Sequence, residues 1–226
     1  MAYLALDTAT EHLSLAVTTP NGIVARDWHV GQKHAELTLP HLEALLADCE
    51  LGINDLEGIA FGNGPGSFTG LRIGCGIAQG LAFARAIPAL GISTLAALAA
   101  RCDHERVLAC LDARMNQVYL AAYVRGGSGW QTVIEPRVCD PDQIPLPEGA
   151  GWIGVGSGFA AYGEALTARL GAQLASVEEG YFPHAREILK LALPIFAAGQ
   201  GRPAAELELV YLRDKVALKT HERAKK

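Results

Sequence analysis

Short apolar segments separated by turn residues open the chain. Residues 2–7 and 12–18 are mostly aliphatic, and the polar residues 8–11 separate them. Pro20-Asn21-Gly22 then separates the second segment from a third over residues 23–29. Apolar runs of this length between turn signals are typical of β-strands, and tight turns favour antiparallel neighbours. The pattern therefore predicts three antiparallel strands in hairpin succession.

The apolar spacing becomes helical after residue 33 and later alternates between helix and strand. Leucines recur at helical spacing over residues 34–49, which predicts an amphipathic helix. The proline-rich residues 140–149 are expected to be irregular. The other predicted elements are strands over 58–62, 87–92, 107–112, 118–123, 132–134 and 152–156, and helices over 69–86, 94–102, 159–170 and 185–198.

This order of elements is three strands, helix, strand, helix, strand, helix, followed by a looser repeat of the same series. Two-lobed proteins of the actin and sugar-kinase type, in which each lobe resembles ribonuclease H, have such an order. We therefore predict an α/β protein with the two-lobed actin-like fold and a reduced second lobe. The N-terminal lobe is expected over residues 1–104, and the smaller lobe, with a basic tail, over residues 105–226.

Composition limits the classes of function. Charged residues make up 19% of the chain, below the ~25% usual for soluble domains, which suggests that some apolar surface is kept for a partner protein. The formal net charge of −5 argues against a protein that grips nucleic acid alone. Residues 213–226 hold six Lys and Arg against two acidic residues; we interpret them as a solvated tail, with contact to nucleic-acid phosphate as the alternative.

Localisation is expected to be cytoplasmic. No apolar run approaches the ~18 residues that a membrane-spanning helix needs, and the first residues do not resemble a signal peptide. The five cysteines are scattered and form no CxxC pair, so reduced thiols are expected.

A glycine-rich segment over residues 62–74, GNGPGSFTGLRIG, precedes the helix predicted at 69–86. Glycines permit a tight strand-to-helix turn, and amides at a helix start can hold an anion. The segment fits neither the Walker motif nor GxGxxG. A structural turn is favoured, and anion or nucleotide binding is the alternative; the candidate residues for it are Asp7, Gly64, Gly66, Ser67 and Gly156.

Small residues line the predicted helix that follows. One row repeats every fourth residue from Gly70 through Gly74 to Ala86, and Gly76 and Gly80 lie in a neighbouring row. Each glycine inside a helix costs ~1 kcal/mol relative to alanine, so close approach of another backbone is the expected compensation. That backbone belongs either to this chain's own core or to a partner. The candidate partner-interface residues, from this helix and from the helix at 34–49, are Gly70, Ile73, Gly74, Ile77, Leu81, His34, Leu37 and His41.

These segments together resemble one family. The glycine-rich segment, LALDTAT at residues 4–10, LDARMNQVY at 111–119 and VYLR at 210–213 closely resemble the bacterial TsaB family, also called YeaZ. The resemblance implies the actin-like fold and a role in forming threonylcarbamoyladenosine at the adenosine 3′ of the anticodon, in tRNAs that read codons beginning with A. In that family's pathway the transfer is attributed to the sister protein TsaD, which holds the metal and works with TsaB and the ATPase TsaE.

The sister family also provides a chemical comparison. Its pattern is a histidine, a GPG loop, a glycine-rich helix and a strand that ends in a His-x-x-x-His pair binding the catalytic metal. This chain matches each step but has Thr94 and Leu98 at the pair. A leucine side chain offers no lone pair to a metal. We therefore expect no catalytic residue, no metal and no cofactor in this chain, and at most weak nucleotide binding, because the turns after Asp7 and Asp112 lack glycine.

The resemblance implies partners as well. We expect a heterodimer with TsaD, TsaE in a larger complex, a homodimer when the chain is alone, tRNA contacted mainly through the complex, and no membrane. Two alternatives stand against this. One is an actin-like enzyme with Asp7 as its metal or base residue; the other is a peptidase, although Ser67 does not lie in a GxSxG elbow.

Overall fold

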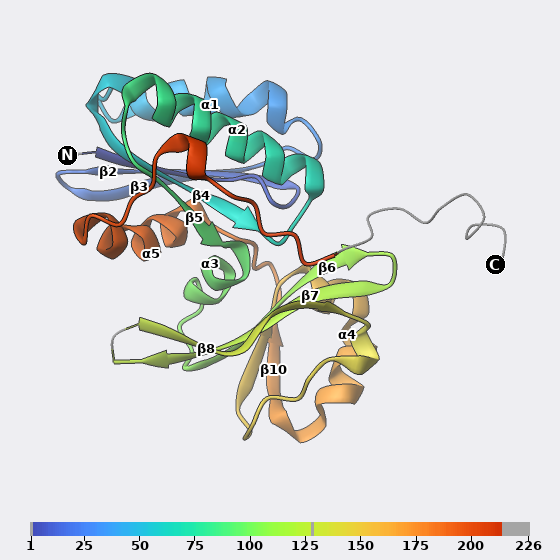
Figure 1. Cartoon of the computed structure of the whole chain (residues 1–226). Helices are drawn as coiled ribbons and strands as arrows, with labels where there is room; N and C mark the ends of the chain where they lie inside the picture. The colour runs from blue at the N-terminus through green and yellow to red at the C-terminus, as the bar shows by residue number, and fades with distance from the viewer. Residues whose placement is uncertain (1, 128, 214–226) are drawn as a thin grey trace, which may run out of the picture.

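The computed structural model describes residues 2–127 and 129–213, which fold into two lobes (Figure 1). Within these residues each lobe contains one five-stranded mixed sheet. The first sheet has the order β3-β2-β1-β4-β5, with β1 (Ala2–Asp7), β2 (His12–Thr19), β3 (Gly22–His29), β4 (Leu56–Gly64) and β5 (Ala89–Ser93). The second has the order β10-β9-β6-β7-β8, with β6 (Arg106–Arg114), β7 (Gln117–Gly126), β8 (Gly129–Cys139), β9 (Trp152–Val155) and β10 (Leu174–Glu178).

Both sheets have the same topology. When the strands of each sheet are numbered along the chain, the spatial order is 3-2-1-4-5 in both. The first three strands of each sheet pair antiparallel, and the fourth and fifth pair parallel. This repeat confirms the predicted two-lobed actin-like fold. The connection from β8 to β9 contains only a short 3-10 turn at Pro141–Gln143, where the first lobe has an α-helix, and this makes the second lobe smaller.

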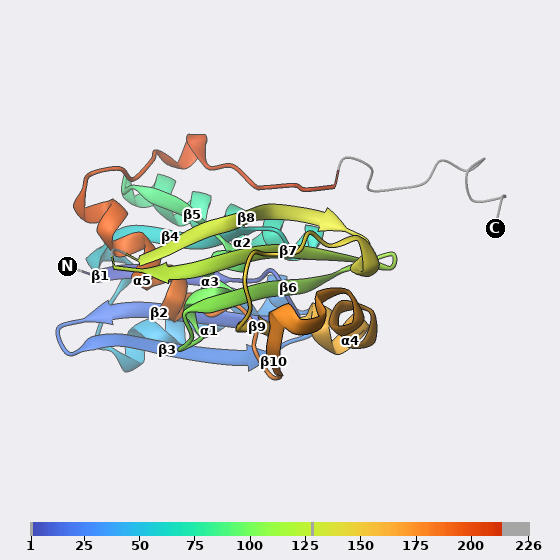
Figure 2. The ribbon, with the colours of Figure 1, turned by 90° about the horizontal axis from the view of Figure 1, so that it is seen from below.

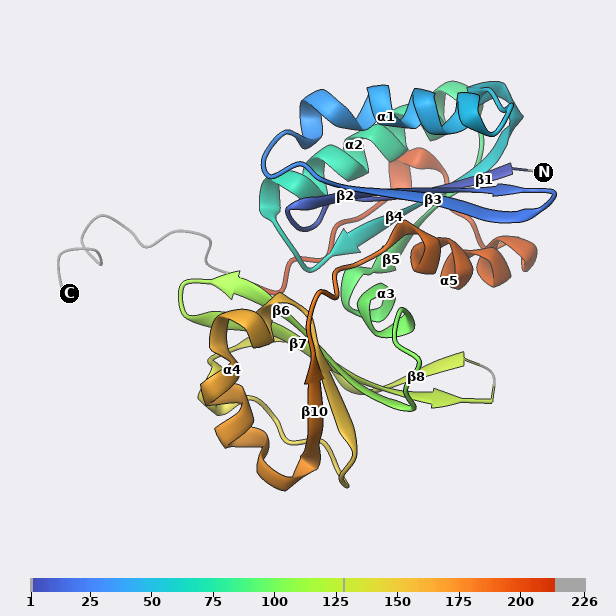
Figure 3. The ribbon, with the colours of Figure 1, turned by 180° about the vertical axis from the view of Figure 1, so that it is seen from behind.

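Helices cover both faces of the first sheet and both faces of the second. α1 (His34–Asp48) and α2 (Phe68–Arg85) lie side by side on one face of the first sheet, and α5 (Ala185–Ala197) packs on the other (Figures 1 and 3). α3 (Thr94–Ala100) lies between the lobes and covers one face of the second sheet, whose other face is packed by α4 (Ser157–Leu170). In Figure 2, viewed from below, β6, β7 and β8 lie in front of the first lobe.

The alternation of side chains in the strands explains these layers. In β1, Leu4 and Leu6 belong to the cluster that packs under α1 and α2, whereas Ala5 belongs to the cluster under α5. Successive side chains of a strand point to opposite faces, so one strand supplies both clusters. Fully burying a leucine contributes about 2 kcal/mol, and both leucines are at most 1% exposed. The small side chains on the other face allow α5 to pack close to the sheet.

The end of the chain returns to the first lobe. Ile188 and Leu189 of α5 are fully buried in the cluster shared with β1, β2 and β4. Arg202 forms an antiparallel bridge with Ala89, and the Val210 N–H donates to the Asn63 carbonyl at 2.8 Å. The predicted boundary at residues 104/105 is therefore wrong for α5 and the segment after it. Periodicity predicts the helix but does not say which sheet its apolar face covers.

Two local predictions also differ from the structure. The strand predicted from residue 87 begins at Ala89, because Ala86 is left-handed (φ 52°) and the Ile87 N–H still bonds to the Ala82 carbonyl of α2. β10 was not predicted, since its residues are exposed or half-buried and show no apolar alternation. No helix among the described residues has the length and apolar character needed to cross a membrane.

Candidate functional site

A cleft of about 1230 Å³ separates the two lobes. The first lobe contributes the turn after β1 and the glycine-rich loop before α2. The second lobe contributes the tip of the β6–β7 hairpin and the start of α4. The lining residues lie mainly in the segments 9–12, 65–71, 111–115, 156–161, 177–182 and 210–213. Four of these segments belong to motifs that the sequence singled out, so the fold brings them to one place.

The glycines of the loop before α2 allow close packing. Gly64 has a φ of 118°, and a Cβ at Gly66 would lie 2.6 Å from the Ala9 carbonyl oxygen. The Ser67 N–H donates to the same carbonyl at 2.8 Å, and the Ser67 hydroxyl accepts from the Gly70 N–H at 3.3 Å. Ser67 is thus the N-cap of α2. Each of these features supports the structural turn that the sequence favoured.

Asp7, a candidate for ligand binding, is sealed inside the first lobe. Its side chain is 1% exposed, and its Oδ1 accepts from the Ala9 N–H at 3.0 Å. Its Oδ2 has no hydrogen-bond partner among the described residues. Burial raises the pKa of this carboxyl to about 7, and the Ala9 hydrogen bond offsets only part of that rise. Asp7 is not among the residues that line the cleft, so it presents no carboxylate charge to a ligand there.

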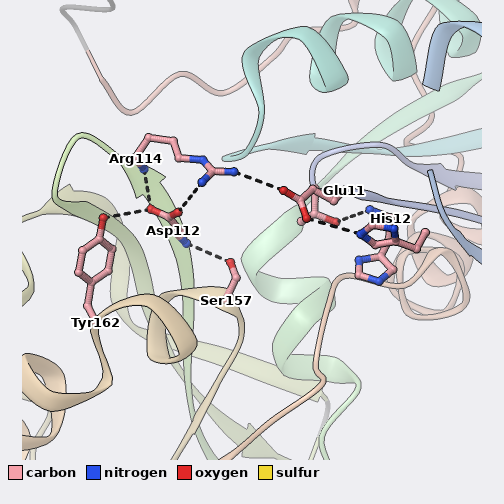
Figure 4. Close-up of polar contacts among 8 residues, drawn as sticks. Glu11, His12, Asp112, Arg114, Ser157 and Tyr162 are labelled. Carbon is pink, nitrogen blue, oxygen red and sulfur yellow. Dashed lines mark hydrogen bonds and ion pairs between the residues drawn. The ribbon is translucent and has the colours of Figure 1, made fainter. Parts of the chain in front are cut away.

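A polar network spans the cleft at the hairpin tip (Figure 4). Arg114 forms an ion pair with Glu11 of the first lobe at 3.4 Å and another with Asp112 at 3.3 Å. The Asp112 carboxylate also accepts hydrogen bonds from the Arg114 N–H at 2.7 Å and from the Tyr162 hydroxyl at 3.3 Å. The Asp112 N–H donates to the Ser157 hydroxyl at 3.1 Å, which ties the hairpin to the start of α4. The Arg114 side chain is 75% exposed, so its ion pairs contribute little to stability.

Gly156, another candidate for anion binding, joins β9 to α4. Its φ is 102°, and a Cβ there would overlap the Cys110 carbonyl oxygen and lie 2.7 Å from the Leu98 side chain. A side chain is therefore excluded by both conformation and space. Close packing explains the glycine without a ligand.

The helix α3 carries Thr94 and Leu98, the two residues that the resemblance sets against the sister family's metal pair. Thr94 and Leu98 are both completely buried. The Thr94 hydroxyl accepts from the Gly64 N–H at 3.2 Å, and Leu98 packs in the core of the second lobe. Among the residues described, no three His, Cys, Asp or Glu side chains gather as they would around a metal ion.

Three of the predicted interface residues point into their own lobe, which corrects the prediction for them. Gly70 lies against the Thr8 carbonyl, and a Cβ at Gly74 would lie 2.5 Å from the Thr8 hydroxyl oxygen. His34 is 4% exposed, with its Nε2 3.2 Å from the His12 carbonyl oxygen. The predicted close approach is made at Gly70 and Gly74 by the chain's own turn after β1, and Ala78 and Ala82 of the same row are buried in the core, so this face is not available to a partner.

The other predicted interface residues are half-buried at the surface. Ile73, Ile77 and Leu81 lie on α2, and Leu37 lies on α1. His41 stacks on Trp28 of β3, with ring centroids 4.1 Å apart.

A second row of α2 faces solvent. Beyond Gly76 and Gly80, a Cβ would meet no atom within 4 Å. Phe83, one turn further, is 81% exposed. We name Ile73, Gly76, Ile77, Gly80 and Phe83 the α2 stripe; they recur at i, i+3, i+4, i+7 and i+10, which places them on one side of the helix. This stripe, rather than the row that includes Gly74, is the outward apolar face.

Comparison with known proteins shows which family these features belong to. The family model described as TsaD: tRNA N6-adenosine threonylcarbamoyltransferase matches residues 11–192. Two relatives are each named tRNA threonylcarbamoyladenosine biosynthesis protein TsaB, one from Haemophilus influenzae and one from Escherichia coli. Both are 36% identical to this chain and match 97% of it. The match covers 96% of the H. influenzae protein and 97% of the E. coli protein. The chain belongs to the TsaB family. YeaZ from Pseudomonas aeruginosa has the same fold, with a TM-score of 0.86, 35% identity and coverage of 93% of this chain and 99% of its own.

Another P. aeruginosa structure with a TM-score of 0.86 and 35% identity, covering 94% of this chain and 99% of its own, is described as similar to peptidase YEAZ. In this TsaB-family chain the Ser67 hydroxyl is engaged as a helix cap, and no histidine is bonded to it within the described residues. Sequence reasoning missed the network of Glu11, Arg114 and Tyr162. The LDARMNQVY segment marks its hairpin, but only the fold brings Glu11 opposite the hairpin tip.

Proposed function

We propose that this chain is a non-catalytic subunit that binds TsaD through α1 and α2. In this role it supports formation of threonylcarbamoyladenosine at the adenosine 3′ of the anticodon, in tRNAs that read codons beginning with A. The names of the TsaB relatives and the TsaD family model support the pathway. The burial of Thr94 and Leu98 supports the non-catalytic role, because neither side chain is placed or equipped to hold the metal of a TsaD-type site.

The α2 stripe is the observation that carries the docking proposal. Glycine at positions 76 and 80 costs the helix about 1 kcal/mol each, and nothing in the described chain packs on either one. A face without Cβ atoms lets another backbone approach closely, and Ile73, Ile77 and Phe83 supply apolar area around it. On α1, Leu39 is 47% exposed and offers a further apolar side chain. A partner that covers this surface would recover the stability that the two glycines cost.

The shared family model suggests how the partner would dock. A TsaD-like domain matches this chain over residues 11–192, which include α1 and α2. Two proteins of one fold can therefore oppose equivalent helix layers about a two-fold or pseudo-two-fold axis. The same geometry would give a homodimer when TsaD is missing. TsaE would join a larger complex in the cytoplasm, and tRNA would be held mainly by the assembly.

The test places a bulky side chain on the stripe. Gly80→Leu fits the isolated chain, because its Cβ meets open space, but would separate two closely packed backbones. We expect at least tenfold weaker binding to purified TsaD by calorimetry. The thermal stability of the free chain should not fall and should rise slightly, because leucine favours a helix more than glycine does. Gly163→Leu is the matched control, since Gly163 is also helical, with open space around its Cβ, but lies on α4. Undiminished TsaD binding by Gly80→Leu would refute the docking surface.

A further inference from the structure

Two aromatic residues that line the cleft, Phe68 and Tyr211, form an exposed group with a neighbouring arginine, Arg72. Phe68 is the first residue of α2 and is 41% exposed, and Tyr211 of the C-terminal segment is 46% exposed. Their ring centroids are 5.6 Å apart. The Arg72 guanidinium lies 3.8 Å from the Phe68 ring centroid, and its Nε donates to the Tyr211 hydroxyl at 3.1 Å. We name Phe68, Arg72 and Tyr211 the aromatic platform.

The platform is held in place from both sides. The Val210 N–H donates to Asn63 at the end of β4, which fixes the chain just before Tyr211. Arg213, two residues later, donates to the Arg114 carbonyl at 3.3 Å and to the Gln117 side chain at 2.8 Å. The segment therefore bridges the two lobes, and Tyr211 is held between its two attachments. Little ordering entropy would be lost if a ligand stacked on a surface that is already fixed.

The exposed faces of the platform have no role in packing the chain's own core. Neither ring belongs to the buried clusters, although burying rings of this size is a main source of core stability. Arg72 and Arg213 form no ion pair with a carboxylate in the part of the chain that the structure describes. The platform thus combines partly exposed aromatic rings with positive charge that carboxylates leave uncompensated.

Charge along the sequence reinforces this. The whole chain holds 19 Lys and Arg against 24 Asp and Glu, yet residues 213–226 alone hold six against two. This basic segment starts two residues after Tyr211. The neighbouring α2 stripe, in contrast, contains no charged side chain, which distinguishes a surface suited to a protein from one suited to a polyanion.

We propose that the aromatic platform is an RNA-binding surface that stacks an unpaired nucleobase of tRNA, with Arg72 and Arg213 close to its phosphates. Proteins recognise single-stranded RNA by stacking bases on aromatic rings and guanidinium planes beside a cationic path for the backbone. Phe68 and Tyr211 supply the rings, and Arg72 and Arg213 supply the cationic groups beside them. This inference rests on the proposed function, because it makes tRNA the polyanion that the assembly brings to the cleft.

The first experiment measures the affinity of the assembled complex with TsaD for an unmodified tRNA transcript. We expect Tyr211→Ala and Phe68→Ala to raise the Kd about tenfold, the usual loss of a base–aromatic stack, with an unchanged salt slope. Arg72→Gln should lower the slope of log K against log salt by about one. Trp130→Ala is the matched control, because Trp130 also lies beside an arginine (5.0 Å), but that arginine, Arg125, is neutralised by Asp103 at 3.0 Å.

Size-exclusion chromatography of the same variants separates this inference from the docking proposal. If Tyr211→Ala or Phe68→Ala abolishes assembly with TsaD, the platform is a protein contact and the RNA assignment is overturned. If assembly and tRNA affinity are both unchanged, the assignment is overturned as well. Normal assembly with tenfold weaker tRNA binding supports it.

A second arm uses the full chain alone and so is independent of TsaD. A 4-thiouridine-containing tRNA is irradiated with the chain at low ionic strength, and the cross-linked peptides are mapped by mass spectrometry. We expect cross-links on the peptides that carry Phe68 and Tyr211. Cross-links confined to other surfaces would overturn the RNA assignment of the platform, even if the wild-type chain failed to bind TsaD.

Discussion

Replacing Asp7 by asparagine should stabilise the protein, by an amount that depends on pH. The folded state holds this carboxyl fully buried with one unpartnered oxygen, and burial raises its pKa from 3.8 to about 7. Between these two values the folded chain keeps a proton that the unfolded chain has released. The folded state then binds more protons than the unfolded state, so stability falls as pH rises through this window.

The magnitude follows from the two pKa values. The loss is about 1.4 kcal/mol for each pH unit, or roughly 4 kcal/mol between pH 3.8 and 7. The substituted asparagine would keep the acceptor for the Ala9 N–H but would bury an amide nitrogen where Oδ2 has no partner, which costs about 1–3 kcal/mol. We therefore expect Asp7→Asn to be more stable than wild type by about 1–3 kcal/mol at pH 8 and to have no advantage at pH 5.

Urea unfolding of both proteins at pH 5, 6, 7 and 8 tests this. The difference in unfolding free energy between variant and wild type should grow steadily up to about pH 7 and then level off. Asp142→Asn is the control, because it makes the same chemical change at an exposed side chain. A constant difference for Asp7→Asn would show that the carboxyl ionises normally and would refute the reasoning.

Three further predictions follow from the same structure. Gly74→Ala should destabilise the chain by about 1–3 kcal/mol in urea unfolding, because its Cβ would lie 2.5 Å from a hydroxyl oxygen. Gly76→Ala has open space around its Cβ and should stabilise the chain by up to ~1 kcal/mol. Equal effects would contradict the assignment of the two faces of α2. Arg114→Ala should change stability by less than ~1 kcal/mol but widen the separation of the lobes in small-angle X-ray scattering, since its ion pair across the cleft is lost; an unchanged scattering profile would contradict this. Burial lowers the pKa of His12 in the folded state, so its contribution to stability is complete above pH 6.5 and declines below it. The Tm of His12→Phe should therefore fall less than that of wild type between pH 7.5 and 5.5. Equal falls in Tm would show that His12 titrates normally.

The sequence predicted the order of elements well because their patterns are local. The hairpin strands of the first lobe and the helices at 34–49 and 69–86 each show their own period, and all were found. The location of α5 was not predictable in this way, since a helix on either sheet shows the same amphipathic pattern.

At the candidate site, too, the local spacing of residues was predictable from the sequence, but contacts between distant residues were not. The small-residue spacing of α2 correctly predicted a close approach, but the sequence does not show which of the two glycine rows faces inward. The structure assigns Gly74 to the core and Gly80 to the surface, since a Cβ at Gly74 meets Thr8 and one at Gly80 meets nothing. Contacts such as Glu11 with Arg114 and Arg72 with Tyr211 join residues more than one hundred positions apart in sequence, and only the folded chain reveals them.

Reconstitution of the modification tests the central claim most directly. Purified TsaD, TsaE, threonylcarbamoyl-adenylate and an unmodified tRNA are combined with and without this chain, and threonylcarbamoyladenosine is quantified in the nucleoside digest. We predict modification only when TsaD and this chain are both present, and none when this chain replaces TsaD, even with added metal. Formation of the modified nucleoside by this chain and metal without TsaD, or at full rate by TsaD and TsaE without this chain, would contradict the account.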